Sequence, residues 1–200
     1  MAPVLVIAAH PHREHSRVNH RLWAAAELPQ VERRDLYALY PDYLIDSAAE
    51  QRALAAAQLV VWLQPIQWYG MTPLLKLWLD DVFAFGWAYG PGGRALAGKD
   101  LWLVASTGGS AAAYHPSGHN RYFFDAFMPP YEQTAALVGM RFLPPLVLHG
   151  AHRASEAAID EHASVFAQRL ASYPDWPEID AIPACEVREV SATERPAEPD

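Results

Sequence analysis

Residues 4–23 read VLVIAAHPHREHSRVNHRLW and join an apolar run to a segment with helical spacing through a short polar loop. The run VLVIAA has the length and the continuous apolar character of a strand that is buried on both faces. Ser16 stands where a helix N-cap is expected, and a helix is predicted over residues 16–27. The chain therefore opens with a strand, a loop and a helix, which is the repeating unit of an α/β fold.

The same alternation continues to residue 172. Further helices are predicted near 47–57, over 73–85, near 129–139 and over 155–172. The segments between them predict the other strands, with the sequences VERRDL, LVVWLQPI, LWLVAS and RFLPPLVLH. About five strands separated by helices predict an α/β domain whose parallel sheet has helices on both faces. Ligands bind such sheets beyond the carboxyl ends of the strands, so a site is expected in the loops that follow them.

Composition predicts a single domain followed by an acidic tail. Of the 200 residues, 52% are hydrophobic, which suits one sizeable core over residues 1–173. Residues 174–200 hold eight acidic residues, two arginines and five prolines, and we expect this tail to be extended or disordered. The net charge of −8 argues against nucleic acid as a partner. The start of the chain, MAPVLVIAAH, lacks the basic region and the long apolar run of a secretion signal, so we expect a cytoplasmic protein.

The loop after the first strand, HPHREHSRVN, has two competing interpretations. His10, His12 and His15 superficially match the HxHxDH pattern of binuclear zinc hydrolases, which would make them metal ligands. In the other interpretation, the loop leads into a helix N-terminus, where unpaired N–H groups, the Ser16 hydroxyl and the Arg17 guanidinium favour a phosphate. We favour the phosphate, because no later loop supplies a recognisable second set of metal ligands.

Two later loops have features of a pocket for a planar ring. After the third strand, Trp68 and Tyr69 offer flat aromatic surfaces. After the fourth strand, STGG at residues 106–109 offers small side chains and backbone N–H groups to a closely approaching ligand. Tyr114 and His119 follow in the same loop and are candidates for proton transfer. Each of these features also has a purely structural interpretation, as core packing or as a turn.

Together, HPHREHSRVN, QWYGMTPLLKLWLDDVF, GWAYGPGG and STGG resemble the flavin-dependent NAD(P)H:quinone oxidoreductases of flavodoxin-like fold. The resemblance covers about residues 3–172 and is greatest to the quinone oxidoreductases that accompany glutathione-regulated potassium efflux antiporters, and more distant to DT-diaphorase. It implies a five-stranded sheet of order 2-1-3-4-5. By position, it implies that the flavin contacts His10, Ser16, Arg17, Val18, Asn19, Ile66, Gln67, Trp68, Tyr69, Ser106, Thr107, Gly108 and Gly109.

The resemblance also implies the reaction. Tyr114 has the spacing of the family's tyrosine that assists hydride transfer, whereas His119 stands one residue earlier than the family's histidine. FMN is the expected flavin and FAD the alternative, with NADPH or NADH as the electron donor and a quinone as the acceptor. The family's enzymes are homodimers, in which the loop at residues 86–93 is expected to cover the flavin and contribute to the interface.

The sequence leaves three functional hypotheses. The first is an NAD(P)H dehydrogenase that reduces quinones. The second is a regulatory flavin-binding subunit that docks on the cytoplasmic face of a potassium/proton antiporter, which would place the chain at the inner face of the cell membrane through its partner. The third is a metal-dependent hydrolase that uses His10, His12 and His15.

Overall fold

The computed structural model describes residues 4–182, which form a five-stranded parallel sheet with the order β2-β1-β3-β4-β5. This order confirms the prediction. The strands are β1 (Val4–Ala8), β2 (Val31–Asp35), β3 (Leu59–Pro65), β4 (Asp100–Ser106) and β5 (Arg141–Leu148). The order reverses between β1 and β3, because the chain moves outward from β1 to β2 and then returns to β3 on the other side. Ligands of open α/β sheets bind beside such a reversal.

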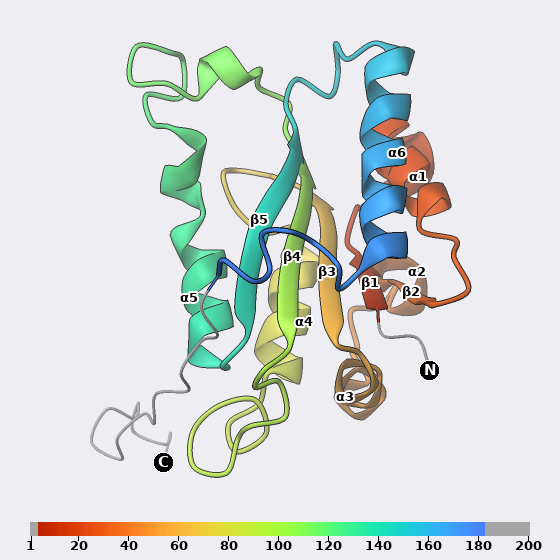
Figure 1. Cartoon of the computed structure of the whole chain (residues 1–200), viewed down its shortest axis with the longest axis vertical. Coiled ribbons are helices and arrows are strands. Elements are labelled where there is room, and N and C mark those ends of the chain that lie inside the picture. The colour runs from red at the N-terminus through yellow and green to blue at the C-terminus, as the bar shows by residue number, and fades with distance from the viewer. Residues whose placement is uncertain (1–3, 183–200) are drawn as a thin grey trace.

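Helices cover both faces of the sheet (Figure 1). On one face, α1 (Arg17–Ala25) packs against α6 (Glu156–Ser172). The other face is covered by helices from the middle of the chain, namely α2 (Leu36–Leu39), α3 (Ser47–Ala56), α4 (Pro73–Val82) and α5 (Pro129–Leu137). Short 3-10 turns at η1 (Arg13–His15), η2 (Ala111–Ala113) and η3 (Phe124–Phe127) lie in the loops that follow β1 and β4.

The continuous apolar character of the strands results from burial on both faces. In β1, Leu5 and Ile7 pack into the core under α3 and α4, whereas Val4 and Val6 pack into the core under α1 and α6. All seven residues of β4 are buried as well. A central strand with an apolar side chain at nearly every position therefore fits the pleat, in which successive side chains point to opposite faces.

Local capping fixes where two of the helices begin. The Ser16 side chain accepts a hydrogen bond from the backbone N–H of Asn19, and the Ser155 side chain accepts one from the N–H of Ala158. Each serine satisfies one of the N–H groups that a helix leaves unpaired in its first turn. The first residue of α1 is therefore set at the carboxyl end of β1.

Residues 174–182 differ from the predicted extended tail. Trp176 and Ile179 are buried in the core under α6. The Trp176 ring meets the Trp102 ring edge-on at a centroid distance of 4.8 Å, and its Nε1–H donates to the carbonyl of Arg169 at 2.9 Å. The composition of this segment is acidic and rich in proline, which led to the prediction of an extended tail. Burial of two apolar side chains nevertheless holds the segment against the domain. The prediction for residues 183–200 lies outside the described residues.

Within residues 4–182, none of the helices has the length and apolar character needed to cross a membrane.

Candidate functional site

A cleft of about 490 Å³ lies beyond the carboxyl ends of β1, β3 and β4. It therefore occupies the position that the strand order predicts for a ligand. The predicted site residues that line it come from all three loops and are His10, Ser16, Arg17, Val18, Ile66, Gln67, Ser106, Thr107 and Gly108. The loop after β5 also contributes, through Ala151 and His152, which the sequence analysis did not assign to the site.

At one end of the cleft, the first turn of α1 presents unpaired backbone N–H groups. The backbone N–H groups of Arg17 and Val18 donate to no other group within the described part of the chain, as expected at a helix N-terminus. Both residues line the cleft, together with Ser16, which caps the helix. Unpaired N–H groups and the helix dipole favour a negative charge at this point.

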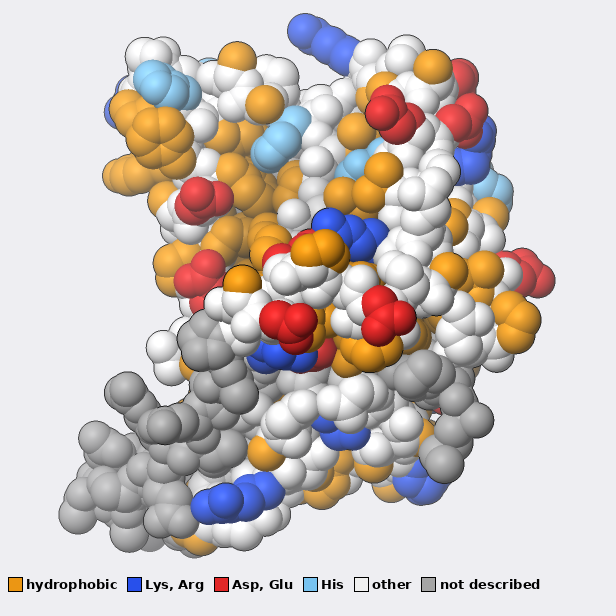
Figure 2. All heavy atoms as spheres, viewed as in Figure 1, with side chains coloured by type: hydrophobic (Ala, Val, Ile, Leu, Met, Phe, Trp, Pro, Cys, Tyr) orange, Lys and Arg blue, Asp and Glu red, His pale blue; other side chains and the backbone are white. Residues whose placement is uncertain are grey.

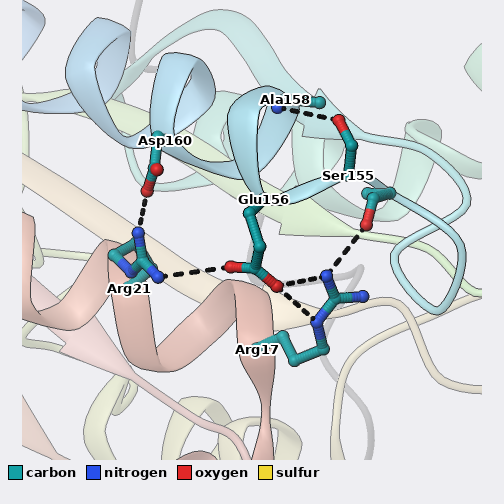
Figure 3. A network of polar contacts seen from close by, with 7 residues as sticks. Arg17, Arg21, Ser155, Glu156, Ala158 and Asp160 are labelled. Carbon is teal, nitrogen blue, oxygen red and sulfur yellow. Dashed lines mark hydrogen bonds and ion pairs between the residues drawn. The ribbon is translucent and has the colours of Figure 1, made fainter.

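Arg17 lines the cleft and also contacts the start of α6 (Figure 3). Its Nε donates to Glu156 at 3.1 Å, and its Nη2 donates to Glu156 and to the carbonyl of Ala154, the latter at 3.0 Å. Arg21, one helical turn further along α1, pairs with Glu156 and Asp160. The hydrogen bond from Arg17 holds the pKa of Glu156 below its usual range. These contacts use one edge of the Arg17 guanidinium, and Nη1 donates to no group among residues 4–182, so it remains free for a ligand.

His10 also presents a donor to the cleft. The backbone N–H of His12 donates to Nδ1 of His10 at 3.0 Å. Burial lowers the pKa of His10, so its imidazole is neutral at neutral pH and carries its hydrogen on Nε2. Because Nδ1 is engaged within its own loop, His10 does not use this nitrogen to join His12 and His15 around a metal. Across the described residues, no three His, Cys, Asp or Glu side chains are placed so that they could hold a metal ion.

Asn19 does not reach the cleft, although the resemblance places it among the flavin contacts. It is 2% exposed and is absent from the lining of the cleft. Its side-chain nitrogen instead donates to Ser16 Oγ at 3.2 Å and to Ser106 Oγ at 3.0 Å. Asn19 therefore connects the loop after β1 to the end of β4 from behind the cleft.

Trp68 and Tyr69 form the middle of a tight turn between Gln67 and Gly70. Both have positive φ values, 47° and 68°, in a conformation that turns of this kind usually give to glycine or asparagine. The Trp68 side chain is 94% exposed, and the Tyr69 ring stacks on Phe127 at 5.1 Å. Neither ring is among the residues that line the cleft, so the predicted aromatic wall stays a prediction.

The STGG segment lies at the other end of the cleft. The backbone N–H groups of Gly108 and Gly109 donate to nothing within residues 4–182, so they are available to a ligand. Gly109 also has a packing role, since an added Cβ would lie 3.3 Å from the Tyr114 ring. The Thr107 hydroxyl donates to the carbonyl of Gly109 at 2.8 Å, and it is therefore not free to donate to a ligand.

Tyr114 is buried beside a histidine that the sequence analysis did not assign to the site. The rings of Tyr114 and His149 are 5.4 Å apart, and Nδ1 of His149 lies 3.0 Å from the Thr107 hydroxyl. Burial raises the pKa of Tyr114 and lowers that of His149. His119, the predicted partner of Tyr114, is exposed and makes no side-chain hydrogen bond within the described residues. His149 directly follows β5, and ligand-binding loops begin at the carboxyl ends of strands. This position in the sequence could have identified it as a candidate site residue.

Exposed aromatic side chains lie in the loop after β4, in the segment that leads into α5. Tyr122 and Phe123 are 62% and 55% exposed. Figure 2 shows hydrophobic side chains gathered over this segment, at the upper left of the view. The loop at residues 86–93, which was expected to cover the flavin, instead lies at the amino ends of the strands, at the bottom of Figure 1. It follows α4, which runs away from the cleft, so it does not cover the cleft of its own chain.

The sequence matches a protein family with a flavodoxin-like fold over residues 2–170. The structure is similar to that of a thermophilic tryptophan halogenase from Streptomycin violaceusniger, with a TM-score of 0.80 and 36% identity over 83% of this chain and 97% of that chain. It is also similar to general stress protein 14 of Treponema denticola in complex with FMN, with a TM-score of 0.79 and 35% identity over 84% of this chain and 98% of that chain.

A third similar structure is an NADPH-quinone reductase from P. pentosaceus. Its TM-score is 0.77 and its identity is 26%, over 84% of this chain and 98% of that chain. These matches span nearly the whole of the compared proteins, so the similarity is one of complete domains.

Proposed function

Because this chain belongs to the flavodoxin-like family that its residues 2–170 match, we propose that it is a flavin-dependent NAD(P)H:quinone oxidoreductase that binds FMN in the cleft. The observation that carries the proposal is the arrangement of hydrogen-bond donors. The N–H groups of Arg17 and Val18 and the free Nη1 of Arg17 lie at one end. The unpaired N–H group of Gly108 lies at the other, and that of Gly109 follows it in the chain. A phosphate suits the first group, and the carbonyl and nitrogen acceptors of a flavin ring suit the second.

The similar proteins support the choice of cofactor and reaction. The T. denticola protein binds FMN, and the P. pentosaceus protein is an NADPH-quinone reductase. The S. violaceusniger protein is named a halogenase, and one fold can carry different reactions. The choice of ligand therefore rests on the hydrogen-bond donors of the cleft. These donors favour a planar ligand that carries a phosphate.

We assign the predicted residues to two parts of the FMN site. At the phosphate end, His10, Ser16, Arg17 and Val18 hold the anion. At the ring end, the contacts come from Ile66, Gln67, Ser106, Thr107 and Gly108, all of which line the cleft. Trp68, Tyr69 and Gly109 do not line the cleft but follow lining residues in the same loops. Asn19 contacts the lining residues Ser16 and Ser106.

The chain's own residues bind the cofactor, orient it and hold a proton. Bound FMN would supply the redox chemistry for hydride transfer from NAD(P)H and two-electron reduction of a quinone. The neutral His10 and the unpaired N–H groups orient the cofactor without adding a competing acceptor. Burial raises the pKa of Tyr114, so its phenol stays protonated at neutral pH. Tyr114 is buried and does not line the cleft, so its assignment as the group that holds the proton needed by a quinone oxygen rests on the family resemblance.

The first test is spectroscopic. Purified protein is incubated with FMN, freed of unbound flavin, and its absorbance is recorded between about 300 and 550 nm before and after anaerobic NADPH or NADH. We expect bound flavin that bleaches on reduction and recovers its colour when a quinone is added. Protein that retains no flavin overturns the proposal. Bound flavin that neither nucleotide reduces favours the regulatory subunit instead.

We also propose that the protein is a cytoplasmic homodimer and that it associates with the cytoplasmic face of a potassium/proton antiporter. The exposed aromatic side chains of Tyr122 and Phe123 support the homodimer, since a second copy would cover them. Only the sequence resemblance supports the second part. Light scattering tests the dimer, and co-purification with the antiporter from solubilised membranes tests the association. A monomer at micromolar concentration contradicts the first part, and failure to co-purify contradicts the second.

A further inference from the structure

Asn19 is a buried polar residue whose side chain contacts both ends of the cleft from behind. It lies in the first turn of α1, is 2% exposed and does not line the cleft. Its side-chain nitrogen carries two hydrogens, and both have partners: Ser16 Oγ at 3.2 Å and Ser106 Oγ at 3.0 Å. Each of these serines does line the cleft. One buried amide thus reaches two hydroxyls that face the ligand.

The hydrogen bonds of Ser16 determine where its own hydrogen points. Ser16 Oγ accepts from the backbone N–H of Asn19 at 3.1 Å and from the Asn19 side chain at 3.2 Å. A hydroxyl oxygen has two acceptor positions and one hydrogen, so both acceptor positions are filled. The hydrogen has no acceptor among the described residues and points to the cleft as a donor.

Ser106 is held in a similar way at the end of β4. Its Oγ accepts from Asn19, and its side chain has no other hydrogen-bond partner within residues 4–182. Because Asn19 offers a donor here, the Ser106 hydroxyl is not directed toward Asn19 and is left to donate to a ligand. Ser106 is 4% exposed, so few other acceptors can reach it.

The remaining atom of the amide supports this orientation. Asn19 Oδ1 is buried and has no hydrogen-bond partner among the described residues. Rotating the amide by half a turn would place the NH2 group there, leaving two buried donors without acceptors. With an acceptor-bearing ligand in the cleft, the observed orientation gives a partner to all four donors, namely the two amide N–H groups and the two serine hydroxyls. The rotated orientation leaves the two amide N–H groups without acceptors, so a ligand with acceptors favours the observed one.

We propose that Asn19 is a positioning residue that sets the polarity of the cleft, turning the hydroxyls of Ser16 and Ser106 into donors that face the ligand. The inference rests on the proposed function, in which the ligand is FMN. Ser16 then donates to the phosphate, and Ser106 donates to an acceptor on the ring. A cleft of this polarity favours ligands that carry acceptors at both ends and discriminates FMN from riboflavin at the Ser16 end.

The test is Asn19→Asp, which keeps the shape of the side chain but replaces its donors with acceptors. An acidic residue is also favourable in the first turn of a helix, so α1 should still form. The affinities of the full-length apoprotein for FMN and riboflavin are measured by flavin fluorescence at about pH 8, where a carboxyl group is ionised. We expect the ratio of FMN affinity to riboflavin affinity to fall about 10- to 100-fold, because Ser16 loses its donor role toward a charged group.

A double-mutant comparison separates hydroxyl polarity from simple charge repulsion. Ser16→Ala should lower the same ratio, and adding Asn19→Asp to Ser16→Ala should change it by less than about threefold if Asn19 acts through Ser16. Ser155→Ala is the matched control, because it removes the N-cap of α6 without removing a hydroxyl from the cleft. It should leave the ratio as in the parent.

The outcomes distinguish this inference from the proposed function. A parent protein that binds neither flavin overturns both. A parent that binds FMN, together with an Asn19→Asp variant whose affinity ratio matches the parent's, overturns the role of Asn19 alone. So does a double variant whose ratio falls a further tenfold, about the effect of a charge acting directly on the phosphate. If Asn19→Asp does not fold, Ser106→Ala replaces it, and an unchanged affinity for both flavins contradicts the inference.

Discussion

The ring of His149 lies 5.4 Å from the ring of Tyr114, and its Nδ1 lies 3.0 Å from the Thr107 hydroxyl. Because Thr107 donates its only side-chain hydrogen to the carbonyl of Gly109, His149 has to donate from Nδ1. Nε2 of His149 is then the acceptor nitrogen. Burial lowers the pKa of His149, which keeps this nitrogen unprotonated at neutral pH. A neutral histidine thus lies beside the buried phenol, whereas His119 is exposed on the loop outside.

Replacement of Tyr114 by Phe keeps the ring that packs against Gly109 and removes the hydroxyl. If the phenol holds the transferred proton, kcat for quinone reduction should fall about 100-fold with bound FMN retained. His149→Ala should lower kcat in the same direction, and His119→Ala serves as the comparison because its side chain is exposed. Steady-state kinetics on the FMN-loaded variants check this. A Tyr114→Phe variant with the parent's kcat would show that Tyr114 only packs.

Arg17→Met tests the phosphate end of the cleft. Methionine retains the apolar stem of the side chain but cannot pair with an anion, so FMN should bind about 10- to 100-fold more weakly while riboflavin binding changes little. Arg21→Met is the matched control, because Arg21 shares the Glu156 partner but does not line the cleft. Flavin fluorescence titration gives both affinities. Equal losses for FMN and riboflavin would contradict a phosphate contact by Arg17.

Glu50→Ala tests a buried carboxylate that does not line the cleft. Glu50 is fully buried, and its oxygens accept from Arg34 Nε at 2.8 Å, from Tyr40 at 2.5 Å and from Trp78 Nε1 at 2.9 Å. Removing it leaves the Arg34 charge with only the more exposed Glu32 as an acidic partner among the described residues, and leaves the Tyr40 and Trp78 donors without their acceptor. These losses should lower the free energy of unfolding by about 3–5 kcal/mol. Glu32→Ala, which removes a more exposed partner of Arg34, should have a much smaller effect. Urea denaturation measures both, and similar losses would be inconsistent with this account.

The sequence predicted those features that depend on one segment at a time. Strand and helix positions followed from apolar periodicity, and Ser16 could be recognised as a cap from its place before the helix. Features that depend on contacts between distant segments could not be predicted from the sequence. Nothing local distinguishes Asn19 as a link to Ser106, or His149 as the neighbour of Tyr114, because each pairing forms only when the strands assemble. Trp176 was missed for the same reason, since its partner Trp102 lies on β4.

The pH dependence of stability offers a last test, at His162 on α6. His162 is buried, Nε2 has no hydrogen-bond partner among the described residues, and burial lowers its pKa. The unfolded chain therefore binds more protons at this residue than the folded chain, so stability is retained above the ordinary histidine pKa of about 6.5 and is lost as the pH falls below it. His162→Gln removes the titrating group. Between pH 7 and pH 5, its free energy of unfolding, from urea denaturation, should fall less than that of the parent. Parallel losses in the two proteins would show that His162 does not contribute to the acid sensitivity, and would leave His10 and His149, whose pKa values burial also lowers, as its sources.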